Sequence, residues 1–537
     1  MISGTPASLN RRMGVAAAVV SGGVLLSRLL GQLREMIFAG MLGADAVTDQ
    51  YVAAFRIPDF LNYLLAGGFL AITFIPIFSR YLANDDEEGG WEALTAIVRP
   101  VALGIAALAV IGWALAPAAI ELIYPEFTTD QVTATVRLTR IVLPAQVFFV
   151  VGALFSAVQY AKGVFTIPTL APIVYNAGII IGGIAFALAT GEADPEGFIW
   201  GALVGAFLGN FALQWWGARR VGMRLTSGTN WRHPALRKYI AIAVPLMVGQ
   251  SIVVLDETFM SVFGDLAGDG AQTRLQYARR TMFVPVGVIA QAAAVAAYPF
   301  LARLFAEGQH GRMADAVDRA LRWVLALSIG AAGLVAAMSL PIVRLLFERY
   351  EFLPADTEDT AGALFFFALA IPIWGGLQVL TRAFYARQEM WTPVIAGSVA
   401  TAAAIPLYWW LQREYGIDGV AVASVLSLGS YTIALAVIWY RKPEHAGRIG
   451  RVLDTAGRAL VPATAGAFSA FAMSWTTQWI LGDGGIAAFI ALVLGASAFA
   501  GGAIAATAGM ASHMETGLGT LLEEPGAPSP KPTLEQP

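Results

Sequence analysis

Runs of about twenty apolar residues, separated by short polar breaks, recur along the whole chain. A run of that length is what an α-helix needs to cross a bilayer, whereas a membrane β-barrel would show shorter alternating segments. The pattern therefore predicts an all-α membrane protein with about fourteen transmembrane helices. They are Gly14–Leu33, Tyr51–Tyr81, Val101–Ile120, Ile141–Tyr160, Pro168–Leu188, Phe198–Gly217, Tyr239–Phe263, Tyr277–Phe305, Trp323–Phe347, Ala361–Phe384, Pro393–Leu411, Val420–Tyr440, Ala459–Ile480 and Ile486–Ala506.

Composition supports this interpretation. Hydrophobic residues make up 57% of the 537 residues and charged residues only 13%, against about 25% charged in soluble proteins. The mean hydropathy is +0.65, so the chain has too few charges to cover several soluble domains. The formal net charge is −3, and no basic excess indicates a nucleic acid as partner.

Few residues of the chain are suited to catalysis. Cysteine is absent, which excludes disulfides, thiol nucleophiles and Cys-ligated metals. The four histidines are scattered near predicted loops or tails, so a histidine metal site is not expected. No Ser/His/Asp constellation or cluster of metal ligands is apparent, and we predict neither enzymatic activity nor a bound metal or cofactor.

The basic residues of the loops predict the orientation. Alternate loops hold most of the Lys and Arg, namely Arg11, Arg12, Arg80, Lys162, Arg219, Arg220, Arg224, Arg232, Arg237, Lys238, Arg303, Arg312, Arg319, Arg387, Arg441, Lys442, Arg448, Arg451 and Arg458. The other loops are mainly acidic, with Glu192, Asp194, Glu196, Asp269, Asp356, Glu358, Asp359 and Asp483. The positive-inside rule then places both termini in the cytoplasm. No small-residue cleavage site follows Arg12, so the first apolar run is expected to be a retained helix.

The chain also repeats itself at an offset of about 223–225 residues. The segment Tyr160–Pro168 matches Tyr385–Pro393, Pro76–Arg80 matches Pro299–Arg303, and Arg56 falls on Arg279. An offset of six spans gives both halves the same orientation, as in transporters built from two parallel repeats that face a central cavity. A duplicated bundle that transports nothing is the alternative. The expected units are two six-helix lobes (1–225 and 226–442), two further helices (443–510) and a disordered, Pro-rich cytoplasmic tail (511–537).

Several charges fall inside the predicted spans, where an Arg costs at least about 2.5–3.5 kcal/mol unless it faces water or a partner. The first half supplies Arg28, Arg34, Arg56, Asp49 and Asp59, and the second half supplies Arg279, Arg280 and the pair Asp256-Glu257. Convergent guanidiniums in a cleft of low dielectric favour a phosphate or pyrophosphate ligand. An alternative interpretation places Arg34, Glu35, Asp49 and Arg280 at the membrane interface. At least one of Asp256 and Glu257 should face the cavity, to bind a cation or to neutralise an Arg.

The motifs around these residues resemble those of the lipid II flippase family (MurJ, formerly MviN) within the multidrug/oligosaccharidyl-lipid/polysaccharide (MOP) exporter superfamily. The likeness covers spans one to twelve in order and is most specific in the first eighty residues. It is carried by the segments Ser27–Glu35, Gly43–Asp49, Ala54–Asp59, Ala66–Gly68, Phe74–Phe78, Thr166–Pro172 with Asn176, Tyr277–Arg280, and Tyr385–Gln388 with Thr392-Pro393.

The resemblance implies a transporter that flips undecaprenyl-pyrophosphate-linked disaccharide-pentapeptide (lipid II) across the bacterial inner membrane by alternating access. In the family the cavity arginines hold the pyrophosphate, and here Arg28, Arg34, Arg56 and Arg280 match them, while Asp49 matches a functional acidic position. Ser27, Arg279 and Asp59 complete the candidate substrate site. Spans thirteen and fourteen would form the groove for the lipid tail, and the cell-wall synthesis machinery is the implied protein partner.

Two departures from the family pattern bear on the site. Asn62 and Tyr63 stand where the family often has two basic residues, so the cavity carries fewer charges. Span eleven lacks the Asn and Asp that bind sodium in some members, although Asp256 matches the acid contributed by span seven. The implied driving force, Na⁺ or the membrane potential, therefore stays open, with Asp256 as the candidate ion ligand.

Other functions remain as alternatives. A flippase for another lipid-linked oligosaccharide or polysaccharide would use the same pyrophosphate handle. A cation-coupled drug exporter of the same superfamily usually has twelve spans and fewer cavity arginines. A membrane scaffold for the cell-wall machinery would be expected to carry an appended soluble domain, and the sequence shows none.

Overall fold

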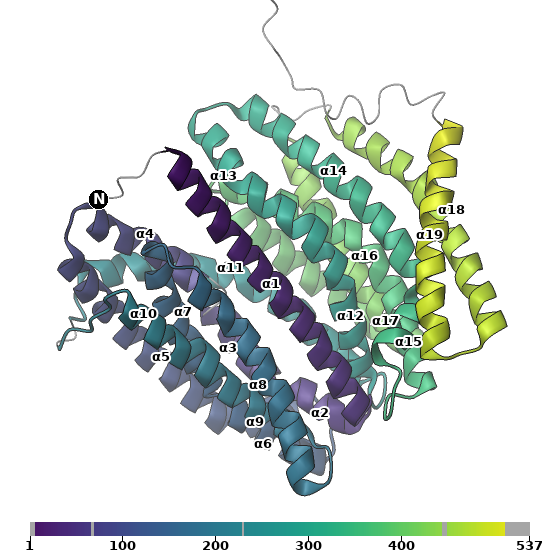
Figure 1. Cartoon of the computed structure of the whole chain (residues 1–537), viewed down its shortest axis with the longest axis horizontal. Helices are drawn as coiled ribbons and strands as arrows, with labels where there is room; N and C mark the ends of the chain where they lie inside the picture. The colour runs from purple at the N-terminus through teal and green to yellow at the C-terminus, as the bar shows by residue number, and fades with distance from the viewer. Residues whose placement is uncertain (1–5, 66–68, 228–229, 443–447, 511–537) are drawn as a thin grey trace, which may run out of the picture.

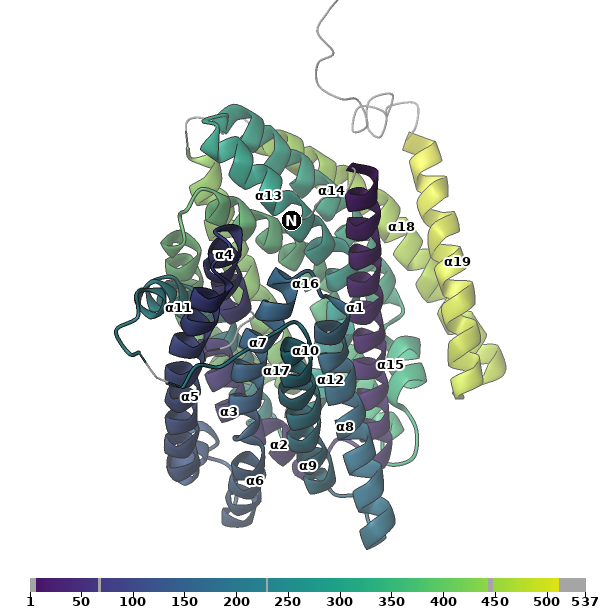
Figure 2. The same ribbon diagram turned by 60° about the vertical axis from the view of Figure 1, so that its left-hand side comes forward.

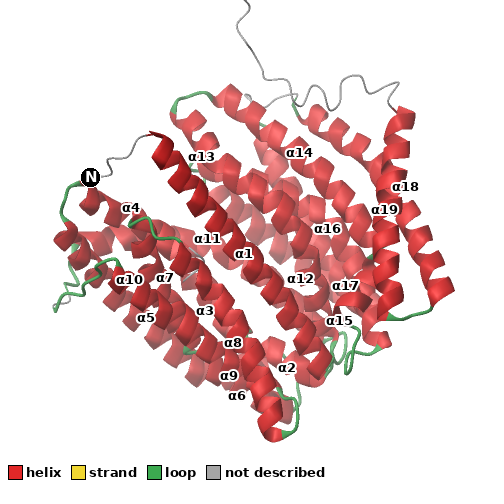
Figure 3. Ribbon diagram, in the orientation of Figure 1, coloured by secondary structure: helices red, strands yellow, loops and turns green. Residues whose placement is uncertain are grey.

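The computed structural model describes residues 6–65, 69–227, 230–442 and 448–510. The predicted tail, 511–537, and the segment 66–68 lie outside these residues, as do the side chain of Tyr63 and those of Arg11 and Arg12. Every regular element in the described part of the chain is a helix (Figure 3). The prediction of an all-α membrane fold is thereby confirmed.

The first part of the chain forms one bundle, at the lower left of Figure 1, with α1 running along the side that faces the second bundle. Its elements are α1 (Pro6–Leu42), α2 (Ala46–Ala54), α3 (Arg56–Leu65), α4 (Phe69–Ala83), α5 (Glu87–Ile123), α6 (Thr129–Val142), α7 (Ala145–Ala161), α8 (Thr166–Thr190), α9 (Pro195–Gly205), the π-helix η1 (Ala206–Ala212) and α10 (Leu213–Arg220).

A second bundle follows, and two further helices flank it (Figures 1 and 2). The bundle contains α11 (Pro234–Asp265), α12 (Ala271–Val286), the π-helix η2 (Gly287–Gln291), α13 (Ala292–Ala306), α14 (His310–Ala337), α15 (Ser339–Phe347), α16 (Pro354–Ala386) and α17 (Trp391–Tyr440). The flanking pair is α18 (Ile449–Leu481) and α19 (Gly485–Met510), which pack on each other and against α14 and α15. Arg344 of α15 fastens the pair through an ion pair with Asp483, 2.8 Å away.

Some predicted spans differ from the observed helices. The second, Tyr51–Tyr81, is divided among α2, α3 and α4, and the eighth, Tyr277–Phe305, is interrupted by η2. The eleventh and twelfth run together as α17 and are separated only by a kink at Gly416, where φ is 54° and ψ is −128°. Charged residues within the second and eighth segments weaken a plain hydrophobic pattern, and π-helical turns occur frequently at functional sites.

The repeat detected in the sequence recurs in the backbone. Helices α4 and α13 both span fifteen residues and are separated by 223 positions at each end. The turns after α7 and α16 are also alike: Gly163 and Gln388, 225 positions apart, both have left-handed backbones, with φ of 78° and 62°.

The surface of the flanking helices α18 and α19 is apolar. Phe468, Trp475, Trp479 and Ile486, for example, each expose more than 60% of their surface, as expected of side chains that contact lipid tails. Eight of the described helices are long and apolar enough to cross a membrane. The count of fourteen spans stays a prediction.

Helices α8 and α9 pack in close contact through small residues. Gly178 and Gly182 on α8 face Gly201 on α9, and a Cβ on Gly201 would meet the α8 backbone. Such small-residue faces let membrane helices approach each other where no hydrophobic effect drives their association. This packing holds α8 against the side of the first bundle that contacts α1.

Candidate functional site

Arg28 lies near the middle of α1. It is 22 residues after Pro6 and 14 before Leu42, or about 33 Å and about 21 Å from the helix ends. Its guanidinium reaches the second bundle, because it fills the space where a Cβ on Gly287 would stand. Gly287 begins η2, and its lack of a side chain leaves the room for Arg28 at this point of the eighth span.

One carboxylate joins the two bundles further along α1. Glu35 accepts a hydrogen bond from Nε of Arg34 at 3.0 Å and is also ion-paired with Arg280 of α12. Glu35 is buried, whereas Arg280 exposes 37% of its side chain. Arg28 and Glu35, seven residues apart on α1, thus face Gly287 and Arg280, which are seven residues apart on the second bundle.

Arg34 is held on its other side by α8. Its Nη1 donates to Oδ1 of Asn176 at 3.0 Å, and Nδ2 of Asn176 donates to the Pro172 carbonyl oxygen. Because α8 packs closely on α9, this contact fixes the guanidinium with respect to the first bundle. Arg34, Glu35 and Arg280 thus form one connected polar cluster with Asn176.

Arg279 forms a chain of polar contacts within the second bundle. Its Nη1 lies 2.8 Å from a carboxylate oxygen of Asp256, and the other Asp256 oxygen accepts a hydrogen bond from Tyr408 at 3.1 Å. The buried pair therefore links α12, α11 and α17. Asp256 neutralises an arginine, which is one of the two roles that the sequence left open for it.

Arg56 begins α3 and is buried against the second bundle. Its Nη1 is 3.5 Å from the Glu257 carbonyl oxygen, and its Nε is buried without a hydrogen-bond partner in the described part of the chain. Asp59 lies in the first turn of the same helix and is partly buried. Arg56 and Asp59 thus stand at the boundary between the bundles, on a different helix from Asp49.

Asp49 links the bundles at the end opposite the start of α1. Its carboxylate accepts hydrogen bonds from the backbone N–H groups of Gly270 at 2.7 Å and Thr273 at 2.8 Å, and from the Thr273 hydroxyl at 2.6 Å. These donors surround the N-terminus of α12, where unpaired N–H groups and the helix dipole favour an anion. We call these hydrogen bonds from Gly270 and Thr273 to Asp49 the Asp49 clasp. Beside it, Tyr124, Ser261 and Gln272 form a second set of contacts.

A cavity of about 510 Å³ opens near the other end, between α1, α3, α7, α8 and η1. Ser27, Arg28 and Asn62 line it together with Ser156 and Asn210. The Asn210 side-chain nitrogen is buried and has no hydrogen-bond partner in the described residues. A cavity wall that combines a guanidinium, hydroxyls and an unpaired amide donor is suited to an anionic, oxygen-rich ligand.

The predicted site residues divide into four groups. Ser27 and Arg28 line the cavity, while Arg34, Arg56, Arg280 and Asp59 lie at or near the boundary between the bundles, and Asp49 closes the far end. Arg279 and Asp256 pair with each other within the second bundle. Asn210 could not be recognised from the sequence, because its π-helical setting has no simple sequence pattern. The bridging position of Glu35 likewise depends on a contact with the distant Arg280.

Comparisons with known proteins identify the family of this chain. A family model described as "Lipid II flippase MurJ" matches residues 38–492. "Probable lipid II flippase MurJ" of Rhizobium meliloti (strain 1021) is 28% identical over 472 residues, which cover 86% of each chain. The protein of the same name from Vibrio cholerae serotype O1 is 27% identical over 442 residues, which cover 78% of this chain and 81% of that protein.

Solved structures show the same fold. The structure titled "Lipid II flippase MurJ, inward closed conformation" matches with a TM-score of 0.72 at 20% identity, covering 92% of this chain and 99% of that one. An inward-facing multidrug resistance MATE family transporter of the MOP superfamily matches with a TM-score of 0.64 at 16% identity, covering 80% and 96%. Because the family model matches most of its length, the chain belongs to the lipid II flippase MurJ family.

Proposed function

We propose that this chain flips lipid II from the cytoplasmic to the outer leaflet of the bacterial inner membrane, and that its cavity arginines bind the pyrophosphate. The observation that carries the proposal is the cavity beside Arg28, which combines a mid-helix guanidinium with the unpaired Asn210 amide. A pyrophosphate offers acceptor oxygens to both groups. The family membership supplies lipid II as the particular lipid-linked pyrophosphate.

We also propose an orientation of the chain in the membrane. Both termini are placed in the cytoplasm, because the Lys and Arg residues gather in the loops at the end where α1 begins. The cavity includes Tyr160, in the last turn of α7, and therefore opens toward that cytoplasmic end. The Asp49 clasp then closes the outer end. In this inward-open conformation the cavity accepts cargo from the cytoplasmic leaflet.

The ion pairs suggest how cargo binding is coupled to opening. Glu35 neutralises Arg34 and Arg280. A pyrophosphate that enters beside Arg28 competes with Glu35 for these two guanidiniums, because both anions accept charge-assisted hydrogen bonds from the same fork of donors. Loss of the Glu35–Arg280 pair would remove a link between the bundles and allow them to move relative to each other.

We propose the membrane potential, and not sodium, as the driving force. A sodium ion at Asp256 would have to replace Arg279, which already occupies one oxygen of that carboxylate at 2.8 Å, while Tyr408 occupies the other. In sodium-free proteoliposomes, transport should then persist when a potential is imposed and stop when a protonophore and a potassium ionophore remove it. Transport that requires sodium at constant potential would contradict this assignment.

Complementation of a strain depleted of its own lipid II flippase tests the cargo. Wild-type chain should restore growth, while Arg28→Ala and Arg56→Ala should abolish rescue with the protein still present in the membrane. A matched control is Arg413→Ala, an exposed arginine of α17 that contacts the ring of Trp409. Well-expressed wild type that fails to rescue would favour another lipid-linked sugar or, given the MATE-like fold, a drug. Rescue by every cavity variant would overturn the pyrophosphate mechanism.

A further inference from the structure

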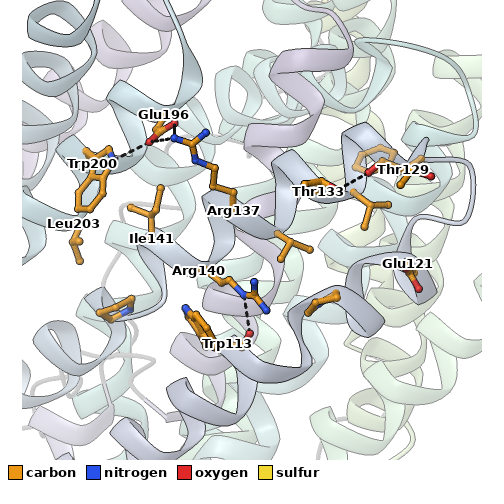
Figure 4. A pocket seen from close by; sticks show the side chains of 15 residues that line it. Trp113, Glu121, Thr129, Thr133, Arg137, Arg140, Ile141, Glu196, Trp200 and Leu203 are labelled. Carbon is orange, nitrogen blue, oxygen red and sulfur yellow. Dashed lines mark hydrogen bonds and ion pairs between the residues drawn. The ribbon is translucent and has the colours of Figure 1, made fainter.

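A second cavity, which we call the flank cavity, lies on the side of the first bundle, away from the cavity beside Arg28. It has a volume of about 970 Å³ and lies between α5, α6 and α9 (Figure 4). This is at the upper end of the 300–1,000 Å³ typical of ligand sites. It lies toward the outer end, since α6 also contacts α2, and the Thr139 hydroxyl donates to the Ala54 carbonyl oxygen.

Arg140 is the central polar group of this flank cavity. Its guanidinium carbon lies 4.2 Å from the ring centroid of Trp113, and its Nε donates to the Trp113 carbonyl oxygen at 3.1 Å. The described part of the chain gives it no carboxylate partner. A membrane-facing arginine without a counter-ion is costly, and its remaining donors are arranged to bind a phosphate in bidentate fashion.

A second arginine is already neutralised. Nη2 of Arg137 lies 2.9 Å and 2.7 Å from the two carboxylate oxygens of Glu196, and the indole N–H of Trp200 donates to the same group at 3.2 Å. Figure 4 shows this pair on one side of Arg140 and Glu121 on the other. Tryptophans concentrate at the level of lipid headgroups, and Trp113 and Trp200 place the flank cavity at that level.

The charges lining the flank cavity cancel, since Arg137 and Arg140 are balanced by Glu121 and Glu196. Glu121 is exposed and lies eight residues beyond Trp113 toward the outer end of α5, or about 12 Å along the helix axis. From the membrane interior outward, the wall thus presents apolar side chains, then the Arg140 cation, then an acid. A phospholipid with an amino headgroup presents acyl chains, a phosphate and an ammonium in that same order.

We propose that the flank cavity binds one aminophospholipid of the adjacent leaflet, a glycerophospholipid whose headgroup joins a phosphate to a primary ammonium. Arg140 binds the phosphate, Glu121 binds the ammonium, and the acyl chains lie along Trp113, Ile141 and Leu203. The neutral lining disfavours lipids with a net negative charge, because Glu121 would face an unpaired anion. The flank cavity shares no lining residue with the cavity beside Arg28. The proposal for it therefore does not depend on which cargo the protein carries.

Native mass spectrometry of the full-length chain tests the proposal, with phosphatidylethanolamine and phosphatidylglycerol of identical acyl chains as probes. Wild type should bind phosphatidylethanolamine more tightly. Arg140→Gln should weaken this binding about tenfold, as expected for loss of one charge-assisted contact. Glu121→Gln should remove the preference for phosphatidylethanolamine. Arg413→Gln is the matched control, because Arg413 lies over the Trp409 ring at 3.7 Å but does not line the flank cavity.

A photoactivatable phosphatidylethanolamine gives a readout on the wild-type protein alone, should a variant fail to fold. It should label peptides from α5, α6 and α9, and unlabelled phosphatidylethanolamine should compete. Equal binding of both lipids by wild type, unchanged binding by Arg140→Gln, or labelling elsewhere would each overturn the proposal. Competition by an undecaprenyl pyrophosphate at this site would instead identify it as a cargo site and overturn the assignment to a bilayer phospholipid.

Discussion

At the scale of single residues, Glu35 is the carboxylate that pairs with an arginine from each bundle. This buried carboxylate serves two guanidiniums, Arg34 on its own helix and Arg280 on the opposite bundle. Sequence alone located all three residues, but it could not pair Glu35 with a residue 245 positions away. The pairing depends on how α1 and α12 lie against each other.

We expect Glu35→Gln to destabilise the protein by about 1–3 kcal/mol, because it leaves the largely buried Arg34 and the partly exposed Arg280 without their shared carboxylate. Thermal unfolding of the detergent-solubilised protein measures the loss. Glu307→Gln is the control: its pair with Arg303 is exposed, and its removal should have a much smaller effect, because exposed ion pairs contribute little to stability. Equal effects of the two substitutions would show that the Glu35 bridge does not hold the bundles together.

At the scale of elements, the turns that follow α7 and α16 share one geometry. In each, the first residue after the helix C-cap has a positive φ, and the N–H of the next residue returns to the last helical turn: Val164 bonds Gln159, and Glu389 bonds Phe384. The repeat in the sequence predicted that these segments correspond. It did not predict that Gln388, a non-glycine residue, would adopt the left-handed conformation.

Replacing glycine by alanine should therefore change the free energy of unfolding in opposite directions at Gly163 and Gly330. Gly163→Ala should cost about 1 kcal/mol, because φ is 78° there although nothing lies within 4 Å of the added Cβ. Gly330→Ala, in the middle of α14 with equally open space, should stabilise by about 0.5–1 kcal/mol through helix propensity. Unfolding midpoints of the two variants compare them, and the same sign for both would contradict the backbone argument.

The loop after α16 also provides a pH-dependent contact. Partial burial alone would raise the pKa of Glu389, but hydrogen bonds from Lys442 at 2.7 Å and Arg387 at 2.9 Å hold that pKa below its usual value. A depressed carboxyl pKa contributes stability above the unfolded-state pKa, and this contribution is lost as the pH falls through the folded-state pKa.

We thus expect Glu389→Gln to be less stable than wild type by about 1 kcal/mol or less at pH 7, given the exposure of the pair. The difference should stay constant down to about pH 5, shrink as the pH falls below the ordinary Glu pKa of about 4.3, and disappear once the pH lies below the lowered pKa of the folded state. Chemical unfolding at a series of pH values measures it. A difference that grows on acidification would refute the sign of the linkage.

At the scale of the whole molecule, the two bundles are joined by the Asp49 clasp at the end opposite the start of α1. In the proposed orientation this is the outer end, and alternating access would require the contact to open so that cargo can leave. The chain contains no cysteine, so Asp49→Cys/Thr273→Cys introduces the only thiols. The side chains they replace are within 2.6 Å of each other.

Oxidation of this double variant should form a disulfide or accept a short dithiol-reactive crosslinker, and it should stop lipid II transport in proteoliposomes. Reduction of the disulfide should restore activity to the level of the unoxidised variant. Each single cysteine variant serves as control, since neither can bridge the bundles. Undiminished transport by a fully crosslinked sample would show that the clasp does not need to open.

The sequence pattern alone predicted much of the architecture of this protein. The length of the apolar runs indicated membrane helices, the loop arginines and lysines predicted an orientation, and the 223-residue repeat predicted two equivalent bundles. The first two properties are encoded by residues close together in the chain. The third is visible as a direct match between two segments of the sequence. The cavity position of Arg28 could also be anticipated, because a charge in mid-helix needs a polar surrounding.

Only the tertiary structure decided which charges meet. It divided the predicted second and eighth spans into shorter helices, paired Arg279 with Asp256, set Glu35 between the bundles, and placed Asp49 at the N-terminus of α12. It also created the unpaired Asn210 amide and the flank cavity around Arg140. The physical reason is that these interactions extend over only a few ångströms between residues far apart in sequence, so helix packing, and not local pattern, selects them.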